Sequence, residues 1–74
     1  MLTRLKSATP GLGLEPELES ELRCEIQTIE SQLNSPKPKT GILKECFRSV
    51  RTILEGTTAA AAGQFIVEIG KFLL

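Results

Sequence analysis

The stretch PELESELRCEIQTIESQLN, residues 16–34, decides the fold of this 74-residue chain. Leucine and isoleucine recur in it at spacings of 4, 4, 3 and 4, at Leu18, Leu22, Ile26, Ile29 and Leu33. At 100° per residue these side chains fall within about 80° of one another, on one face of an α-helix. Proline is tolerated in the first turn of a helix, where Pro16 stands. The pattern therefore predicts an amphipathic helix over about residues 16–34.

Two prolines end this helix, and a second apolar pattern follows them. Pro36 and Pro38 fix φ and remove backbone donors, so the helix cannot continue through them. Over about residues 41–55 the apolar side chains fill an arc of roughly 140°. The connecting loop is short enough for an antiparallel hairpin. We expect the hairpin core to consist of Leu22, Ile26, Ile29, Leu33, Leu43, Phe47, Val50 and Leu54.

A third helix is predicted over about residues 58–73, the most apolar part of the chain. Only Gln64, Glu68 and Lys71 form a polar stripe along it. If the second helix simply continued, this stripe would lie about half a turn out of phase with the polar stripe before it. A break at residues 56–58, where glycine and threonine suit helix ends, resolves the conflict. One continuous helix whose halves contact different neighbours is the alternative.

This third helix has more apolar surface than a hairpin can cover. Its apolar arc exceeds half the circumference, and exposed patches of this kind mark interfaces. Ala59 and Gly63 form a pair of small residues that permits close helix approach. We therefore predict an all-α chain that assembles as an oligomeric helical bundle, a homo-oligomer. The expected interface consists of Ala59, Gly63, Ile66, Ile69, Phe72 and Leu73.

Two other uses of the apolar helix stay open. One is docking onto a larger parent protein or a partner protein, such as a parent enzyme. The other is membrane insertion or surface binding, as in a membrane-active effector. Glu68 and Lys71 count against deep insertion, because each charge costs ~2.5–3.5 kcal/mol at a bilayer centre. We expect no signal peptide, because no apolar stretch follows Arg4 and Lys6, and the sequence given holds no run of 18 apolar residues. We expect a cytoplasmic location, with membrane association as the alternative.

The first 14 residues contain Pro10, Gly11 and Gly13 and show little periodicity. Glycine and proline punctuate regular structure, so we interpret residues 1–14 as a flexible arm. Residues 15–74 then form a single helical domain. A domain of this size is marginal alone, which also favours partners.

The net charge of zero is the sum of two opposed segments. Residues 15–30 carry six acids and one base, near −5, and residues 37–51 carry five bases and one acid, near +4. In an antiparallel hairpin these segments face each other, so charge favours their pairing. The alternatives are two solvated faces, or a partner surface such as anionic lipid near Lys44, Arg48 and Arg51. Zero net charge and few aromatic residues argue against nucleic acid as a partner.

Nothing in the sequence points to catalysis. There is no histidine, and Cys24 and Cys46 match no metal or redox spacing, so we interpret them as reduced thiols. The carboxylates cluster on a helix that looks solvated, where no pocket would tune them for acid–base work. We expect no enzyme, and no catalytic, cofactor or metal site.

Part of the chain resembles a known type of helical tail. The resemblance rests on Ser35-Pro36-Lys37-Pro38-Lys39, on Ile42-Leu43-Lys44-Glu45, and on the run from Ser49 to Gly56. Such a tail closes many uncharacterised bacterial proteins, some of the abortive-infection type. In them a prolyl loop and a Leu-Glu-Gly helix end precede an Ala/Gly-rich apolar helix. The resemblance covers about residues 25–74 and includes no catalytic motif. It implies a bacterial origin, an accessory C-terminal position and a link to phage defence.

Overall fold

The computed structural model describes residues 1–73 and is helical almost throughout, with no strand in that range. The all-α prediction is therefore confirmed. The elements in chain order are α1 (Leu2–Ala8), the 3₁₀ helix η1 (Thr9–Leu12), α2 (Pro16–Leu33), α3 (Thr40–Glu55) and α4 (Ala60–Leu73).

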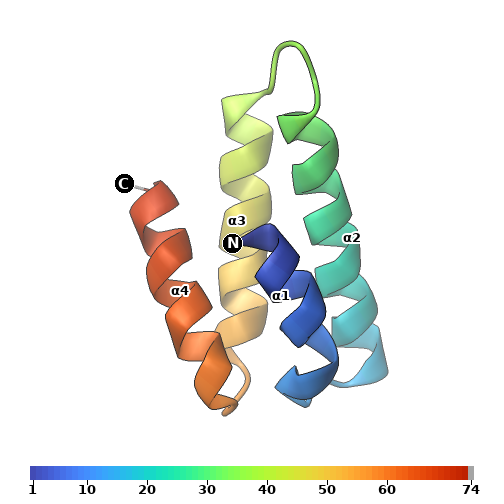
Figure 1. The fold of residues 1–74 in the computed structure, drawn as a ribbon, viewed down its shortest axis with the longest axis vertical. Coiled ribbons are helices and arrows are strands. Elements are labelled where there is room, and N and C mark those ends of the chain that lie inside the picture. Colours follow the sequence, from blue (N-terminus) through green and yellow to red (C-terminus); the bar gives the residue numbers. More distant parts are fainter. Residues whose placement is uncertain (74) are drawn as a thin grey trace.

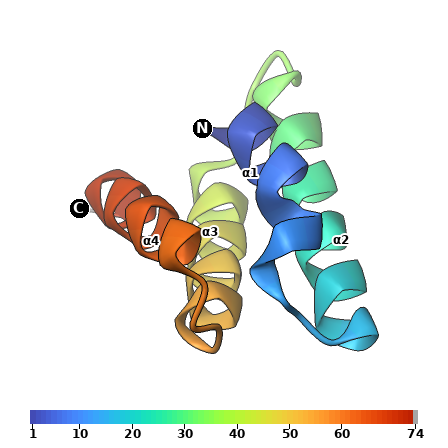
Figure 2. The same ribbon diagram turned by 60° about the horizontal axis from the view of Figure 1, so that its bottom comes forward.

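Three longer helices run side by side, with α3 between α2 and α4 (Figure 1). The chain reverses direction after α2 and again after α3, so that neighbouring helices are antiparallel (Figure 1). In the turned view, α1 and α2 lie on one side and α3 and α4 on the other (Figure 2). The short α1 thus takes the fourth position of a small bundle.

The first residues differ from the expected flexible arm. They form α1 and η1, and Leu5 and Leu12 are buried in the same core as the longer helices. Thr9 is also buried, and its hydroxyl donates to the carbonyl of Leu5 at 2.8 Å, which satisfies its polar group locally. The physical reason for the difference is burial: these leucines gain more from joining the core than the short segment loses in entropy.

Gly13 joins η1 to α2 with a left-handed backbone, φ 68°. Glycine adopts this conformation without the steric cost that a Cβ imposes. Leu12 is held in place beside it, because the Thr57 hydroxyl in the α3–α4 connection donates to the Leu12 carbonyl at 2.6 Å. The same Thr57 oxygen accepts the backbone N–H of Ala59 at 3.3 Å, just before α4 begins. One side chain therefore ties η1 to the turn between the last two helices.

The break expected at residues 56–58 is present, so α3 and α4 are separate helices. Gly56 caps α3, and the chain turns there before α4 starts at Ala60. The polar stripe of α4 therefore faces a different direction from that of α3. A single continuous helix is not what the chain forms.

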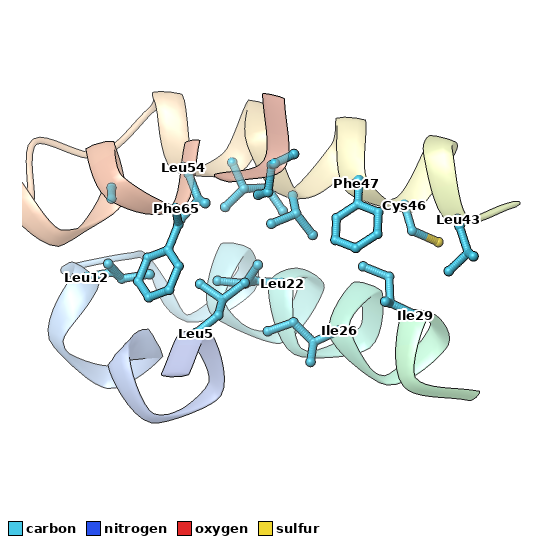
Figure 3. Packing of buried hydrophobic residues seen from close by; sticks show 14 residues of the cluster. Leu5, Leu12, Leu22, Ile26, Ile29, Leu43, Cys46, Phe47, Leu54 and Phe65 are labelled. Atoms are coloured by element: carbon cyan, nitrogen blue, oxygen red, sulfur yellow. The ribbon is translucent and has the colours of Figure 1, made fainter. Parts of the chain in front are cut away.

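The core lies between the two pairs of helices (Figure 3). Seven of the eight residues expected in the hairpin core are buried: Leu22, Ile26, Ile29, Leu43, Phe47, Val50 and Leu54. Leu33 is the exception, with 49% of its surface exposed. It is the last residue of α2 and lies at the rim of an apolar hollow beside Met1 and Leu2. Periodicity placed Leu33 on the correct face, but no element extends far enough to cover it.

Candidate functional site

The inner face of α4 is committed to the chain's own core. Its buried residues are Ala62, Phe65 and Ile69, which point towards α3 and α1. Figure 3 shows Phe65 between Leu5, Leu12 and Leu54. Ile69 was expected at an interface between copies, but it is fully buried within the chain. This part of the prediction is wrong, because the wide apolar arc of α4 did not indicate which third of it faces α3.

One residue of the polar stripe of α4, Glu68, contacts α1. The Arg4 guanidinium forms an ion pair with Glu68 and also lies 5.9 Å from the centre of the Phe65 ring. A cation over an aromatic face is attracted by the ring quadrupole. Arg4 therefore reaches α4 through two contacts. Glu68 lies towards α1, while Gln64 and Lys71 of the same stripe are exposed. The flank of α4 opposite Glu68 carries no charge.

That uncharged flank is the candidate site, and we call it the α4 outer face. At 100° per residue its members fall within about 120° of one another. They are Ala59, Gly63, Ile66, Val67, Gly70 and Leu73. Gly63 and Val67 are exposed and the other four are half-buried. Val67 is the most exposed large apolar side chain of the described residues, at 59%.

The two glycines of the α4 outer face are not required by the chain's own packing. A Cβ added at Gly63 or Gly70 would meet no atom of the rest of the protein within 4 Å. Glycine in a helix interior costs about 1 kcal/mol relative to alanine. The chain therefore accepts this cost at two positions where its own fold has room for a side chain. Missing side chains on a helix surface allow another backbone to approach closely.

Four of the six residues expected at the interface lie on the α4 outer face: Ala59, Gly63, Ile66 and Leu73. Phe72 lies elsewhere, on the flank towards α1, where its ring centre is 4.5 Å from that of Phe47. There it lines a hollow of about 360 Å³ together with Met1, Leu2 and Leu33. The sequence reasoning missed Val67 and Gly70 as members of the face. The spacing of four from Gly63 to Val67 and of three from Val67 to Gly70 was the available signal.

The expected charge pairing between the first two long helices does not take the form of ion pairs. Within residues 1–73 the ion pairs are Arg4–Glu68, Lys6–Glu30 at 3.1 Å and Arg23–Glu19 at 3.9 Å. None of them joins α2 to α3, although these helices pack along their length. Apolar contacts therefore set the pairing of α2 with α3. Apart from Glu19 and Glu30, the acids of α2 form no ion pair within residues 1–73, and neither do the basic residues of α3.

The two cysteines have different surroundings. Cys24 is exposed and Cys46 is buried, and both are free thiols. Burial raises the pKa of the Cys46 thiol from 9.0 to about 11, and a hydrogen bond to Glu25 and the charges of Glu25 and Glu45 add to this effect. A thiol with a raised pKa stays protonated and is a poor nucleophile.

Two further surveys concern the described part of the chain. Across residues 1–73, no three Cys, Asp or Glu side chains come together in a way that could hold a metal ion. None of the helices described here has the length and apolar character needed to cross a bilayer.

No protein-family model, no curated protein and no solved structure matches this chain. The resemblance of residues 25–74 to the helical tail of bacterial proteins thus stays a prediction.

Proposed function

We propose that this protein is a non-catalytic helical self-association module whose copies meet through the α4 outer face. The observation that supports this best is the combination on one flank of α4 of an exposed valine, Val67, with two glycines that the chain's own fold does not need. The face carries no charge, and desolvating it costs no ionic hydration.

The small residues of the α4 outer face suit close contact between two helices. A surface of glycine, alanine and branched aliphatic side chains lets two helix backbones come near each other, so that van der Waals contact replaces exposed apolar area. Ile66 and Leu73 are already half-buried, and a second copy would complete their burial. The 74-residue chain has a small core of its own, so added apolar burial stabilises it appreciably.

The first test is the mass of the protein in solution, measured by light scattering without detergent. The expected result is an assembly larger than one chain at micromolar concentration. Gly63→Leu fills the space that a second helix would need, so it is expected to raise the dissociation constant at least tenfold. A monomeric wild-type protein under these conditions would contradict the proposal.

Gly41→Leu is the matched control for Gly63→Leu. Gly41 is also an exposed helical glycine with no atom within 4 Å of an added Cβ, but it lies in the first turn of α3, away from the α4 outer face. The Gly41→Leu substitution should leave the mass of the assembly in solution unchanged. Equal masses for the wild type and the Gly63→Leu variant would exclude this face as the interface.

The role of the module in the cell is also a proposal, and it rests on the resemblance. The tail-like pattern of residues 25–74 favours an accessory part of a bacterial defence protein. Expression of the chain in bacteria challenged with phage, with Gly63→Leu as the association-deficient comparison, tests this role. Flotation with anionic vesicles tests the membrane-active alternative, and a pull-down from the native host tests a docking tail. Protection that is lost in the variant would support self-association as the working property.

A further inference from the structure

The fourth position of the bundle is only partly filled. Helix α1 has 7 residues, whereas α2, α3 and α4 have 18, 16 and 14. Because every residue adds the same rise, α1 is at most about half as long as the helices that it packs among. Both α2 and α3 continue beyond the N-terminal end of α1, and no further helix lies over α3 there (Figure 1).

An apolar hollow lies at this uncovered end. Its volume is about 360 Å³, and it is lined by the first residues of α1 and by one residue from each longer helix: Met1, Leu2, Thr3, Leu33, Phe47 and Phe72. Phe47 is the most deeply buried of them, at 2% exposed, whereas Leu33 and Phe72 are 49% and 51% exposed. The hollow is therefore concave, with a buried aromatic floor and an apolar rim that the chain leaves open.

The end of the molecule around the hollow is basic. The end of α2, the start of α3 and the end of α4 meet here, because neighbouring long helices are antiparallel. Residues 1–3, 31–47 and 69–73 contain four lysines and one acid: Lys37, Lys39, Lys44, Lys71 and Glu45. The acid lies on the flank of α3 towards α2, where it lines hollows with Glu21 and Glu25. None of the four lysines forms an ion pair within residues 1–73.

We infer that this hollow docks an amphipathic helix of a partner protein, with apolar side chains on one face and carboxylates on the other. Helices that bind in grooves insert apolar side chains spaced three or four residues apart. Here those side chains would cover the exposed rim residues, Leu33 and Phe72, which stabilises the complex through apolar burial. Carboxylates on the polar face complement the four unpaired lysines, which selects an acidic partner and its orientation.

The concave shape favours a helix over a bilayer surface as the occupant. A bilayer receives side chains that protrude from a protein, whereas Phe47 lies recessed at the bottom of the hollow. The hollow also lies beyond the N-terminal end of α1, in the part of the fourth bundle position that α1 leaves empty. A helix docked there extends the packing that α1 begins.

The inference goes beyond the proposed self-association and uses a different side of α4. Phe72 and Gly63 are nine positions apart, so their side chains point in opposite directions from the helix axis. A partner helix in the hollow therefore leaves the α4 outer face open to a second copy.

Peptide binding tests the hollow. The probe is a fluorescently labelled synthetic peptide of about 15 residues, with leucines at spacings of three and four on one face and glutamates on the other. In anisotropy titrations we expect it to bind the wild-type protein, and Phe72→Ser to raise the dissociation constant at least about tenfold. Val67→Ser removes another exposed apolar side chain of α4 and is the matched control, with an unchanged dissociation constant.

Leu33→Ser is a second variant of the rim, at the end of α2. It should weaken binding as Phe72→Ser does, so the test does not depend on the folding of one variant, which circular dichroism checks. Lys71→Glu tests the charge and should raise the dissociation constant at least about threefold. Arg48→Glu makes the same charge change on the flank of α3 towards α2 and should have no effect.

Several results would overturn the inference. One is equal binding of the peptide by the wild type and both rim variants. Another is equally tight binding of a peptide with lysines in place of the glutamates, which would exclude an acidic partner. Flotation with anionic vesicles that Phe72→Ser abolishes would make a lipid surface the occupant, and a lower mass in solution for Phe72→Ser would make it a second copy. The mass of the Gly63→Leu variant is independent of all these results, so self-association through the α4 outer face is judged separately.

Discussion

At the scale of single residues, Cys46 and Cys24 show how burial decides the chemistry of one side-chain type. Cys46 lies in the core beside Phe47, within reach of the Glu25 carboxylate, whereas Cys24 faces solvent. The neighbouring negative charges and the low-dielectric surroundings both disfavour the Cys46 thiolate. The structure therefore gives the two thiols different reactivities without any disulfide between them.

We predict that alkylation distinguishes the two cysteines. At pH 8 iodoacetamide should modify Cys24 and leave Cys46 thiol intact in the folded protein, which mass spectrometry of proteolytic fragments would reveal. Urea unfolding should expose Cys46 to the reagent. Equal rates at both positions in the native protein would show that Cys46 is accessible and that its pKa is not raised.

The same pKa shift predicts a pH dependence of stability. The folded-state pKa of Cys46, about 11, lies above the ordinary value of 9.0, so the unfolded thiol loses its proton first. Its contribution to stability is fully present below pH 9 and is lost as the pH rises towards 11. The Cys46→Ala variant is the comparison that isolates this thiol: the free energy of unfolding of the variant should fall less steeply over that interval. Parallel slopes in the two proteins would contradict the prediction.

At the scale of elements, α1 is the part that the sequence reasoning did not anticipate. Leu2, Leu5, Ala8 and Leu12 follow one another at spacings of 3, 3 and 4, which is a helical pattern, but the Pro and Gly residues after Ala8 favoured irregular structure. The chain accommodates both by changing from an α-helix to a 3₁₀ helix at Thr9, where Pro10 stands in the first turn. Local patterns did not show whether the longer helices leave space for this segment.

The longer helices were predictable because each carries several turns of one apolar face between breaks in the chain. What periodicity cannot supply is the number of neighbours that each face meets. Leu33 and Ile69 lie on apolar faces, yet Leu33 is exposed at a helix end while Ile69 is buried against α3. The candidate site could not be predicted for the same reason. The flank of α4 that stays uncovered depends on the position of α1 beside Glu68, which the sequence pattern does not give.

We predict that α1 contributes to global stability through Leu5. Leu5 is fully buried, so Leu5→Ala should lower the free energy of unfolding by about 2–5 kcal/mol, as other buried leucines do. Ser7→Ala, at an exposed position of the same helix, is the control and should change it by less than about 0.5 kcal/mol. Urea unfolding followed by circular dichroism gives both values. A Leu5→Ala variant as stable as the wild type would mean that residues 1–14 do not pack on the core in solution.

At the scale of the whole molecule, the described part of the chain has one small core and, outside it, the uncharged α4 outer face. The core is continuous from α1 to α4, and its interior includes the buried parts of every helix. The exposed side chains of the α4 outer face lie outside that core, and this face is uncharged and rich in small residues. Folding and assembly are therefore expected to be linked through the helices that supply both core and surface.

This linkage predicts a stability that depends on protein concentration. Because association binds the folded chain and not the unfolded one, it adds to the free energy of unfolding by mass action. For a dimer that unfolds to separate chains, each tenfold rise in concentration adds about 1.4 kcal/mol per dimer. The urea midpoint of the wild type should therefore rise as the protein concentration is raised from about 1 to about 100 µM. The Gly63→Leu variant should show little such rise, because it is expected to associate weakly. The change in helix propensity shifts its stability by the same amount at all concentrations. A wild-type midpoint that stays constant over this range would place the folded state in a single chain.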